Sequence, residues 1–288
     1  MKKVLLFAQG FFGEKVYEAL KANNIYAELY TYAAASTRRK SDKEHLRDGF
    51  PYRYIHERSF DASLIQVGEE SLILCADWTK DFFHKNPPPC LVYHIHPSLL
   101  PMYRGYGAVS EQFLKGVTLS GVTLYRDDGG IDTGPILFQE KLRIAFDDIP
   151  ADFLTKAAAC AGSWAARLVR GDIPSEKTQE GFSFYSQRRR KPQTTLDLNV
   201  TALYAYNTIR AYSAPFSGAL LMIGNKQYII RRANCEKWTG VHGTPGEVIS
   251  LSAYGAELAC GEGSIIIREL EFEGKHYQNA EVSELFTI

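Results

Sequence analysis

The sequence lacks several features that would place a protein in a specialised class. It has no run of about 18 apolar residues, so no membrane-spanning helix is expected. Its five cysteines stand far apart without a CxxC pair, which excludes a disulfide framework and a cysteine zinc site. The apolar run at residues 4–8 breaks at Gln9-Gly10 and is too short for a secretion signal. A cytoplasmic protein without a membrane partner is therefore expected.

An excess of charge of one sign is also missing. Lys plus Arg total 33 and Asp plus Glu total 33, which gives a formal net charge of zero. Proteins held mainly by nucleic-acid phosphates usually carry a basic excess. The balance therefore disfavours a nucleic-acid partner, although it is compatible with a local basic patch.

The 288 residues have an ordinary globular composition, with 45% hydrophobic and 23% charged residues. At about 150 residues per domain, this length predicts two domains. Short apolar runs alternate with helical patterns up to residue 170, which predicts an α/β fold with a mostly parallel sheet. Strands are expected at 3–8, 26–32, 72–75, 91–95, 121–126 and 136–144, and helices at 13–23, 107–116 and 152–170.

The composition changes after this region. Residues 172–200 hold prolines, threonines and the basic run Arg188-Arg189-Arg190-Lys191, which indicates a connecting segment. One helix is expected at 201–212, and short strands with glycine turns follow from Gly218 onward, which is typical of a small barrel or sandwich. We therefore expect one domain over 1–200, including the connecting segment, and a β domain over 201–288.

A glycine-containing loop, Ala8-Gln9-Gly10-Phe11-Phe12-Gly13, lies between the first expected strand and the first helix. Its glycines permit a tight turn, and a helix N-terminus favours anions. The full GxGxxG dinucleotide fingerprint is absent, so a nicotinamide cofactor is not expected. Turn geometry alone accounts for these glycines.

The densest group of polar residues begins at the carboxyl end of an expected strand, where open α/β sheets bind ligands. His94 and His96 are two positions apart, so an extended backbone points both to the same side. A glycine-rich loop further along carries Asp132. Spacing alone leaves three interpretations open: polar residues with a structural role, a metal site built on these three ligands, and metal-free acyl transfer with an imidazole tuned by a carboxylate.

Four motifs occur here in a specific order: His96-Pro97-Ser98-Leu99-Leu100-Pro101, Tyr103-Arg104-Gly105, Gly121-Val122-Thr123-Leu124 and Ile131-Asp132-Thr133-Gly134. Their order and spacing closely resemble the folate-dependent formyltransferases. Pro215-Phe216-Ser217-Gly218-Ala219 and Pro245-Gly246-Glu247-Val248-Ile249 are similar to the C-terminal module of the tRNA and sugar enzymes of that family. The resemblance covers nearly the whole chain and implies a Rossmann-like catalytic domain with a small OB-like β-barrel.

The resemblance implies a catalytic set of His94, His96 and Asp132 that acts without a metal. The family uses an Asn-x-His motif and a distant aspartate, and His96 and Asp132 match the histidine and the aspartate. His94 stands where the family has asparagine, whose amide helps hold the formyl oxygen as it gains charge. An imidazole also donates a hydrogen bond, but its reach and charge differ. The change is compatible with slower transfer, a shifted pH optimum or hydrolysis of the formyl donor.

The implied reaction moves a formyl group from the co-substrate N10-formyltetrahydrofolate to a primary amine. His96 and His94 are expected to stabilise the oxyanion, and Asp132 to interact with His96 and help remove the amine proton. The pterin is expected against Ala76, Asp77, Arg126, Asp127, Asp128 and Gly129. The acceptor is expected to meet Lys80, Ser98, Tyr103, Arg104 and Arg188. The charged residues among these are also typical of a solvated surface.

The basic run before Leu196-Asp197 is most like the family members that formylate nucleotide-linked amino sugars. Such enzymes belong to lipopolysaccharide and O-antigen biosynthesis. The expected partners are therefore folate and a nucleotide-linked amino sugar, with no nucleic acid, and the C-terminal β surface is compatible with a homodimer. The alternatives are methionyl-tRNA formyltransferase, formyltetrahydrofolate hydrolase, a metal-dependent hydrolase and a binding module that has lost the chemistry.

Overall fold

The computed structural model describes residues 2–32, 50–56, 60–61, 65–78, 82–84, 86–186, 195–240 and 243–287. The chain divides into two compact units. The first comprises Met1–Ala108, Leu119–Ile144 and Asp152–Ser186, and the second comprises Val109–Thr118, Ala145–Ala151 and Gln187–Ile288. The domain boundary expected at residue 200 falls inside the last segment of the second unit and stays a prediction.

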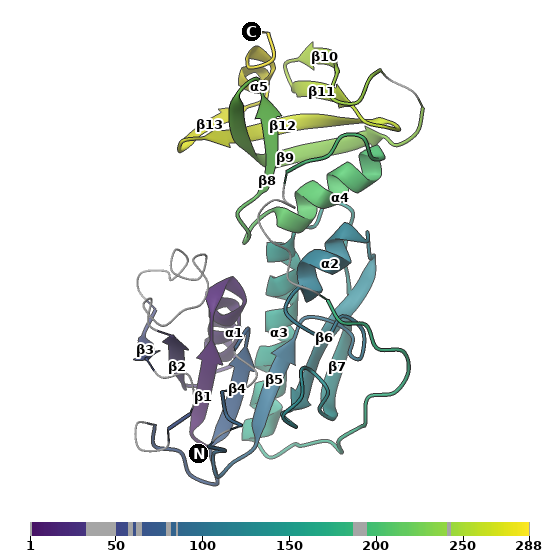
Figure 1. Ribbon diagram of the computed structural model, residues 1–288. Coiled ribbons are helices and arrows are strands. Elements are labelled where there is room, and N and C mark those ends of the chain that lie inside the picture. The colour runs from purple at the N-terminus through teal and green to yellow at the C-terminus, as the bar shows by residue number, and fades with distance from the viewer. Residues whose placement is uncertain are drawn as a thin grey trace. The chain divides into compact units, whose positions relative to one another are not determined.

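A seven-stranded sheet forms the centre of the first unit, in the order β3-β2-β1-β4-β5-β6-β7 (Figure 1). The first five strands in this order pair in parallel, whereas β5, β6 and β7 pair antiparallel. The predicted α/β fold with a mostly parallel sheet is confirmed. The strands are β1 (Val4–Ala8), β2 (Ala27–Tyr32), β3 (Tyr52–Ile55), β4 (Leu72–Ala76), β5 (Val92–His96), β6 (Leu119–Arg126) and β7 (Ile136–Arg143).

The central strands are recognisable in the sequence because both of their faces are covered. All residues of β1, β4 and β5 are buried, and they form short apolar runs, as parallel strands with two covered faces do. In contrast, β3 is a short strand with two exposed residues between its ends, and the sequence did not predict it. The ends of the other predicted strands in this unit shift by at most two residues.

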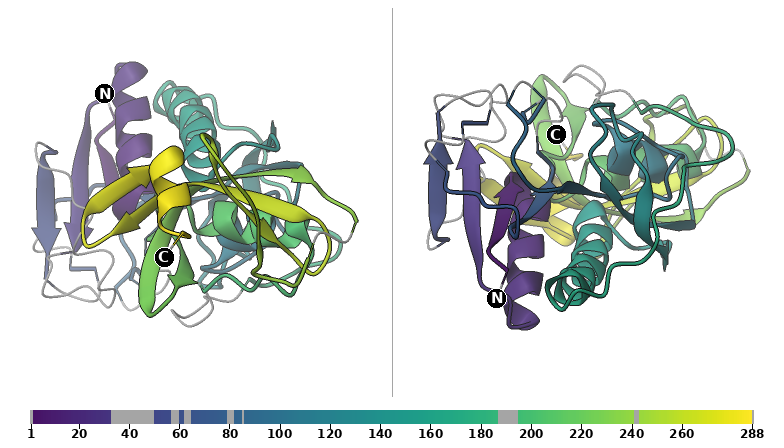
Figure 2. Two further views of the ribbon diagram at one scale, coloured as in Figure 1. Left: turned by 90° about the horizontal axis from the view of Figure 1, so that it is seen from above. Right: turned by 90° about the horizontal axis from the view of Figure 1, so that it is seen from below.

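Helices cover one face of this sheet. Figure 2 shows α1 (Gly10–Ala22) and α3 (Pro150–Val169) side by side on that face. They approach closely at Gly162, where an added β-carbon would lie 2.7 Å from the carbonyl oxygen of Ala19. A larger residue at that point would push the two backbones apart. Gly162 therefore permits the helix packing that buries the apolar face of α3.

An aromatic cluster covers part of the opposite face. It includes Phe7 of β1 and Trp78, which follows β4, and the ring of Trp78 stacks on that of Tyr32 at 4.2 Å. The parallel register aligns Cys75 of β4 with His94 of β5. Paired residues in a sheet point to the same side. His94 therefore lies on this face, beside the aromatic cluster, and away from α1 and α3.

The second unit contains a six-stranded antiparallel sheet, which confirms the predicted small β domain at the C-terminus. The path of the sheet is β10-β11-β12-β9-β8, and β13 pairs with β12. The sequence missed β13 and the short helix α5. The elements of this unit are α2 (Ala108–Leu114), α4 (Ala202–Tyr212), β8 (Ala219–Ile223), β9 (Lys226–Lys237), β10 (Val248–Ser252), β11 (Gly255–Ala259), β12 (Ser264–Phe272), β13 (Lys275–Gln278) and α5 (Ala280–Glu284).

A buried arginine explains why residues 145–151 belong to the second unit. The guanidinium of Arg210, on α4, donates to the carbonyl oxygens of Asp148 at 2.9 Å and Ala145 at 2.8 Å. It also donates to the side-chain oxygen of Asn207 at 3.1 Å. These three bonds satisfy a charge that is only 6% exposed, and they tie the segment before α3 to α4.

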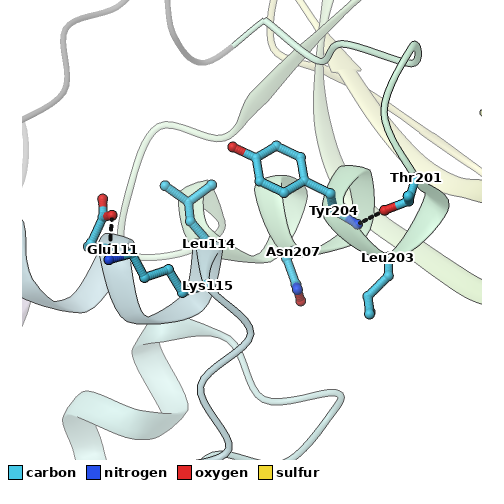
Figure 3. Close-up of a pocket in the computed structure, with 7 residues that line it drawn as sticks. All are labelled: Glu111, Leu114, Lys115, Thr201, Leu203, Tyr204 and Asn207. Carbon is cyan, nitrogen blue, oxygen red and sulfur yellow. Dashed lines mark hydrogen bonds and ion pairs between the residues drawn. The ribbon is translucent and has the colours of Figure 1, made fainter. Parts of the chain in front are cut away.

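A cavity of about 410 Å³ lies within the second unit (Figure 3). Its walls come from α2 and from the first turns of α4, which Thr201 caps by accepting a hydrogen bond from the backbone N–H of Tyr204. None of the predicted site residues lines it. The cavity is lined by Glu111, Leu114, Lys115, Thr201, Leu203, Tyr204 and Asn207.

Among the described residues, no helix has the length and hydropathy that a bilayer crossing requires.

Candidate active site

The sheet register assembles the centre of the predicted site. His94 pairs with Tyr125 of β6, and His96 pairs with Thr123. All four side chains therefore lie on the face away from α1 and α3. His94 is 1% exposed and His96 is 4% exposed. The sequence prediction that both histidines share one side of their strand is confirmed by this register.

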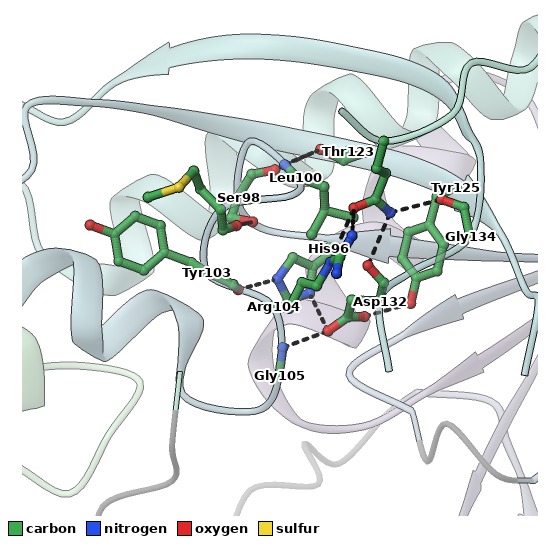
Figure 4. Close-up of polar contacts among 12 residues, drawn as sticks. His96, Ser98, Leu100, Tyr103, Arg104, Gly105, Thr123, Tyr125, Asp132 and Gly134 are labelled. Carbon is green, nitrogen blue, oxygen red and sulfur yellow. Dashed lines mark hydrogen bonds and ion pairs between the residues drawn. The ribbon is translucent and has the colours of Figure 1, made fainter. Parts of the chain in front are cut away.

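The structure brings Asp132 to His96, as Figure 4 shows. The Oδ2 atom of Asp132 lies 3.5 Å from Nδ1 of His96, and the carboxylate is fully buried. Oδ2 also accepts a hydrogen bond from the backbone N–H of Gly105 at 2.7 Å. Oδ1 accepts one from the hydroxyl of Tyr125 at 2.5 Å. A buried carboxylate needs such partners, and here they fix both of its oxygens.

Three predicted site residues have an unusual backbone conformation. Asp77, Tyr103 and Asp132 have φ values of 51°, 58° and 55°, in the left-handed region that non-glycine residues rarely adopt. They are three of the six described non-glycine residues with positive φ. Such conformations cost about 1–3 kcal/mol and concentrate at functional sites. Their grouping here is independent support for the location of the site.

A glycine makes the Asp132 loop feasible. A β-carbon on Gly134 would lie 1.7 Å from the carbonyl oxygen of Arg126, a distance that no side chain tolerates. The loop therefore returns against the end of β6 only because position 134 has no side chain. The N–H of Arg126 bonds the carbonyl oxygen of Pro135 at 3.0 Å and closes the loop. This closure folds the segment between these residues over the face that carries the histidines.

A second histidine–carboxylate contact lies beside the first. Nε2 of His94 is 3.6 Å from Oδ2 of Asp127, and Nε2 of His84 is 3.6 Å from Oδ1 of the same carboxylate. Burial raises the pKa of Asp127, but the neighbouring imidazoles of His94 and His84 and the backbone N–H of Gly129 outweigh this and leave the pKa lowered. Asp127 is therefore an anion flanked by two imidazoles.

Tyr125 connects the two pairs. Its ring stacks on His94 with centroids 5.4 Å apart and 17° between the planes, and its hydroxyl bonds Asp132. Burial, followed by the nearby charge of Asp132, raises the pKa of Tyr125 well above its usual value. The phenol therefore stays neutral and acts as a hydrogen-bond donor at ordinary pH.

The loop that follows β5 holds the predicted acceptor residues. Ser98 is fully buried, and its hydroxyl donates to the carbonyl oxygen of Met102 at 2.7 Å. This contact shapes the loop, and a direct contact of Ser98 with substrate stays a prediction. Tyr103 packs edge-to-face on Phe184. The backbone N–H of Arg104 donates to the carbonyl oxygen of Phe184 at 2.8 Å, so residues 184–186 run beside this loop.

Gln179 links the predicted acceptor arginine to the catalytic loop. Its side-chain oxygen accepts from Nη2 of Arg104 at 2.7 Å and from Nε at 3.2 Å. Its amide donates to the carbonyl oxygens of Asp132 at 3.0 Å and Gly134 at 2.7 Å. The guanidinium of Arg104 also lies over the ring of Tyr185. The orientation of Arg104 is thus set by the segment that the sequence indicated only as a connection.

The two stretches predicted for the pterin begin at opposite ends of the strands, because β6 runs antiparallel to β5 whereas β4 runs parallel to it. Ala76 ends β4 and is buried, and Asp77 follows it near the N-terminus of α1, at Gly10. Asp127, in contrast, donates its backbone N–H to Val92, the first residue of β5. The contact between His84 and Asp127 joins the segment after β4 to the second stretch.

The remaining residues of the second stretch form a polar turn. Arg126 forms a bidentate ion pair with Glu176 at 2.7 and 3.0 Å. Asp127 and Asp128 accept hydrogen bonds from the backbone N–H groups of Gly129 and Gly130. Lys80 and Arg188, predicted to meet the acceptor, lie outside the described residues. Among the described residues, no group of three His, Cys, Asp or Glu side chains is arranged to hold a metal ion.

The sequence did not single out Tyr125, Gln179 or His84. Tyr125 had one usable signal: it lies on a predicted strand, at an even spacing from Thr123, and directly follows a motif that the family resemblance includes. Gln179 and His84 lie in irregular segments without periodicity, so no local pattern marks them. Only the folding of those segments onto the sheet brings them to the site.

The family of the chain follows from comparison with known proteins. Residues 1–168 match the family described as formyl transferase, and residues 189–283 match the family described as formyl transferase, C-terminal domain. The chain therefore belongs to the formyl transferase family, and the predicted family resemblance is confirmed.

The similar proteins are described with different substrates or ligands. A methionyl-tRNA formyltransferase of Myxococcus xanthus is 33% identical over 192 residues, which cover 65% of this chain and 60% of the relative. The N-formyltransferase of Helicobacter canadensis, solved with folinic acid and dTDP-3-aminofucose, is 17% identical with a TM-score of 0.64. That likeness covers 93% of this chain and 99% of the other.

A second similar structure is HypX from Aquifex aeolicus in complex with tetrahydrofolic acid. It is 17% identical with a TM-score of 0.67, and the likeness covers 99% of this chain but 47% of HypX. At these identities, the structural likenesses establish the fold alone. The chain spans about 60% of the methionyl-tRNA formyltransferase that it matches and about half of HypX.

Proposed function

We propose that this protein transfers a formyl group from N10-formyltetrahydrofolate to the primary amine of a nucleotide-linked amino sugar. The observation that carries the proposal is the buried pair of His96 and Asp132, held by Tyr125 and the Gly105 backbone beside a polar loop. An imidazole and a carboxylate in contact are the groups that proton transfer and oxyanion stabilisation in formyl transfer require.

In this mechanism the folate supplies an activated formyl carbon. The formyl oxygen would replace the carbonyl oxygen of Tyr103 as the acceptor of the Nε2–H of His96, while Asp132 keeps the imidazole oriented at Nδ1. Asp132 also attracts the proton that the attacking amine loses, directly or through water. One proton leaves the amine and one joins the folate nitrogen that releases the formyl group, so the transfer from a neutral amine is balanced. His94 is the second donor to the formyl oxygen.

The binding groups surround this pair. The folate co-substrate would lie between the segment that follows β4, from Ala76 and Asp77, and the loop from Arg126 to Gly129. These segments offer carboxylates and backbone groups that suit a pterin, which both donates and accepts hydrogen bonds. Arg104 is held beside the Asp132 loop by Gln179, and its guanidinium suits an acceptor phosphate. Tyr103, Ser98, Lys80 and Arg188 complete the proposed acceptor set.

Two observations favour a sugar acceptor over tRNA. The zero net charge provides no general attraction for a polyanion. The likeness to the H. canadensis enzyme, whose ligand is a nucleotide-linked amino sugar, extends over almost the full length of both chains. The sequence match to the M. xanthus methionyl-tRNA formyltransferase covers 65% of this chain and 60% of the relative, at a higher sequence identity.

Two other functions each have one observation in their favour. Sequence identity to methionyl-tRNA formyltransferases favours a tRNA acceptor. The imidazole of His94 in place of the family asparagine favours hydrolysis of the formyl donor, because a second titratable group beside the formyl carbon can activate water.

A single assay separates these functions. The protein is incubated with N10-formyltetrahydrofolate and with UDP-, dTDP- or GDP-linked amino sugars, or with methionyl-tRNA, and the products are analysed by mass spectrometry. A mass gain of one CO on a sugar nucleotide supports the proposal. Formylation of methionyl-tRNA alone, or release of formate without an acceptor, would overturn it in favour of the corresponding alternative.

A further inference from the structure

The cavity in the second unit has the size and the wall chemistry of a small-molecule site. Its volume of about 410 Å³ falls within the range of ligand pockets. Leu114 and Leu203 give it apolar surface, and Lys115 and Asn207 bring nitrogen donors to its wall. None of the residues that line it belongs to the candidate active site. A ligand held here would therefore not compete for the catalytic residues.

Asn207 presents an amide nitrogen to this cavity. The residue is only 6% exposed, and its side-chain oxygen accepts a hydrogen bond from Nη1 of Arg210 at 3.1 Å. A guanidinium only donates, so the oxygen must face Arg210 and the nitrogen remains for the cavity, whose lining residues Figure 3 shows. Among the described residues, this nitrogen finds no acceptor. A buried donor without an acceptor indicates a ligand that accepts hydrogen bonds.

The turn after α2 fixes the position of this amide. Gly116 has a φ of 62°, in the left-handed region, and a β-carbon on it would lie 2.9 Å from Nδ2 of Asn207. The absence of a side chain at Gly116 therefore lets the turn close against the amide. Because Arg210 holds the oxygen and the turn confines the nitrogen, the donor is in place before a ligand binds.

The guanidinium behind Asn207 makes its amide a stronger donor. Arg210 is 6% exposed, and within the part of the chain that the structure describes it forms no ion pair. Burial lowers the pKa of Arg210, and Tyr206, Asp148 and Asp147 offset this in part, so the guanidinium stays charged at ordinary pH. In a low-dielectric interior, its charge polarises the amide through their hydrogen bond. An oxyanion at Nδ2 is attracted by both groups.

The cavity wall carries two further features that favour an anion. Lys115 contributes an ammonium group, and the first turn of α4 carries the positive end of the helix dipole. Glu111 opposes them, because its carboxylate lies 3.5 Å from Nζ of Lys115. However, the side chain of Glu111 is 13% exposed and that of Lys115 is 45% exposed, so the ammonium is the more accessible of the two charges.

We propose that this cavity binds a small organic anion, whose carboxylate or phosphate oxygens accept hydrogen bonds from Nδ2 of Asn207 and from Nζ of Lys115. The apolar part of the ligand packs against Leu114 and Leu203. Carboxylate and phosphate share the chemistry that this wall recognises, whereas a neutral molecule of the same shape lacks it. The proposal concerns binding alone and does not depend on the formyl transfer.

Calorimetric titrations with benzoate, phenyl phosphate and benzamide test the class of ligand. Benzamide has the shape of benzoate without its charge, so it should bind at least about 10-fold more weakly than the better of the two anions. The anion that binds more tightly identifies the favoured head group. Benzamide binding as tightly as both anions, or no binding of either anion up to about 10 mM, would overturn the proposal.

Variants of the wall test whether the anion binds in this cavity. Asn207→Asp keeps an oxygen for Arg210 but replaces the donor by a carboxylate, so the affinity for the anion should fall at least about 10-fold. Gln227→Glu, which makes the same change of charge at an exposed position of β9, is the matched control and should leave the affinity unchanged.

Lys115→Gln provides a second variant at a partly exposed position, in case Asn207→Asp does not fold by circular dichroism and thermal melting. It should weaken anion binding about two- to fivefold, because it removes one partly exposed charge. Wild-type affinity in a folded Asn207→Asp protein, or in Lys115→Gln, would show that the anion binds elsewhere and would overturn the proposal.

Discussion

The Nε2 atom of His96 lies 2.7 Å from the carbonyl oxygen of Tyr103. A carbonyl only accepts hydrogen bonds, so Nε2 carries the hydrogen. Nδ1 of the same ring faces the Asp132 carboxylate at 3.5 Å. The negative charge of that carboxylate favours a hydrogen on Nδ1 as well. The loop that contains Tyr103 therefore helps determine the protonation of the predicted catalytic histidine, and its left-handed backbone at Tyr103 directs that carbonyl.

Asp132→Asn tests the central pair directly. The substitution preserves the shape of the side chain but removes the charge that orients and protonates His96. We expect kcat for formyl transfer to fall about 100- to 10,000-fold, the range for loss of acid–base assistance. Circular dichroism and thermal melting serve as the control for folding. An Asp132→Asn enzyme with near-normal turnover would exclude the assigned role.

Tyr125→Phe removes the hydroxyl that bonds Oδ1 of Asp132. The carboxylate is fully buried, so the loss leaves it short of a donor, and the free energy of unfolding should fall by about 1–3 kcal/mol. We also expect kcat to fall, because Asp132 is less firmly held. Urea denaturation and steady-state kinetics measure the two effects. Tyr93→Phe, on the opposite face of the same sheet, is the matched control and should leave kcat close to the wild-type value.

Gln179 can be probed with two variants that separate its contacts. Gln179→Ala removes the contacts to Arg104 and to the carbonyls of Asp132 and Gly134, and should lower kcat about 10- to 100-fold by loosening the loop. Gln179→Glu keeps an oxygen for Arg104 but loses the amide donors. It should therefore preserve KM for the acceptor better than Gln179→Ala does. Unchanged kcat in both variants would show that the loop is held by other contacts.

The lowered pKa of Glu257 predicts how the stability of the second unit depends on pH. Burial raises the pKa of this carboxyl, but hydrogen bonds from Lys237, Ser264 and Ser250 outweigh it and lower the pKa from 4.5 to about 2. The ionised form therefore stabilises the folded state above the unfolded pKa, and this stabilisation is lost as pH falls toward the folded pKa.

The matching experiment compares the wild type with Glu257→Gln. A pKa difference between 4.5 and about 2 corresponds to about 3 kcal/mol, which is the expected loss of unfolding free energy in the variant at pH 7. This difference in unfolding free energy between the wild type and Glu257→Gln should disappear as pH falls from about 4.5 to about 2. A gap that stays constant over this range would show that the carboxylate charge is not the source of the stability.

The sequence predicted the parallel core well because central strands with two buried faces appear as uninterrupted apolar runs. It missed β3, whose exposed middle residues break that pattern, and it gave no reason for residues 145–151 to pack with the C-terminal unit. Arg210 provides that reason, through hydrogen bonds to carbonyls more than 60 residues earlier in the chain. Hydrogen bonds between residues so far apart in the chain leave no periodic pattern in the sequence.

At the candidate site, too, some features follow from the sequence and others only from the tertiary structure. The sequence by itself determined that His94 and His96 share a side of one strand, since residues two apart in an extended chain must do so, and its motifs identified Asp132. Only the tertiary structure decided which carboxylate each histidine meets: Asp132 for His96 and Asp127 for His94. The reason is that a loop folding back over a sheet places its side chains by backbone turns and long-range hydrogen bonds, which local residue patterns do not encode.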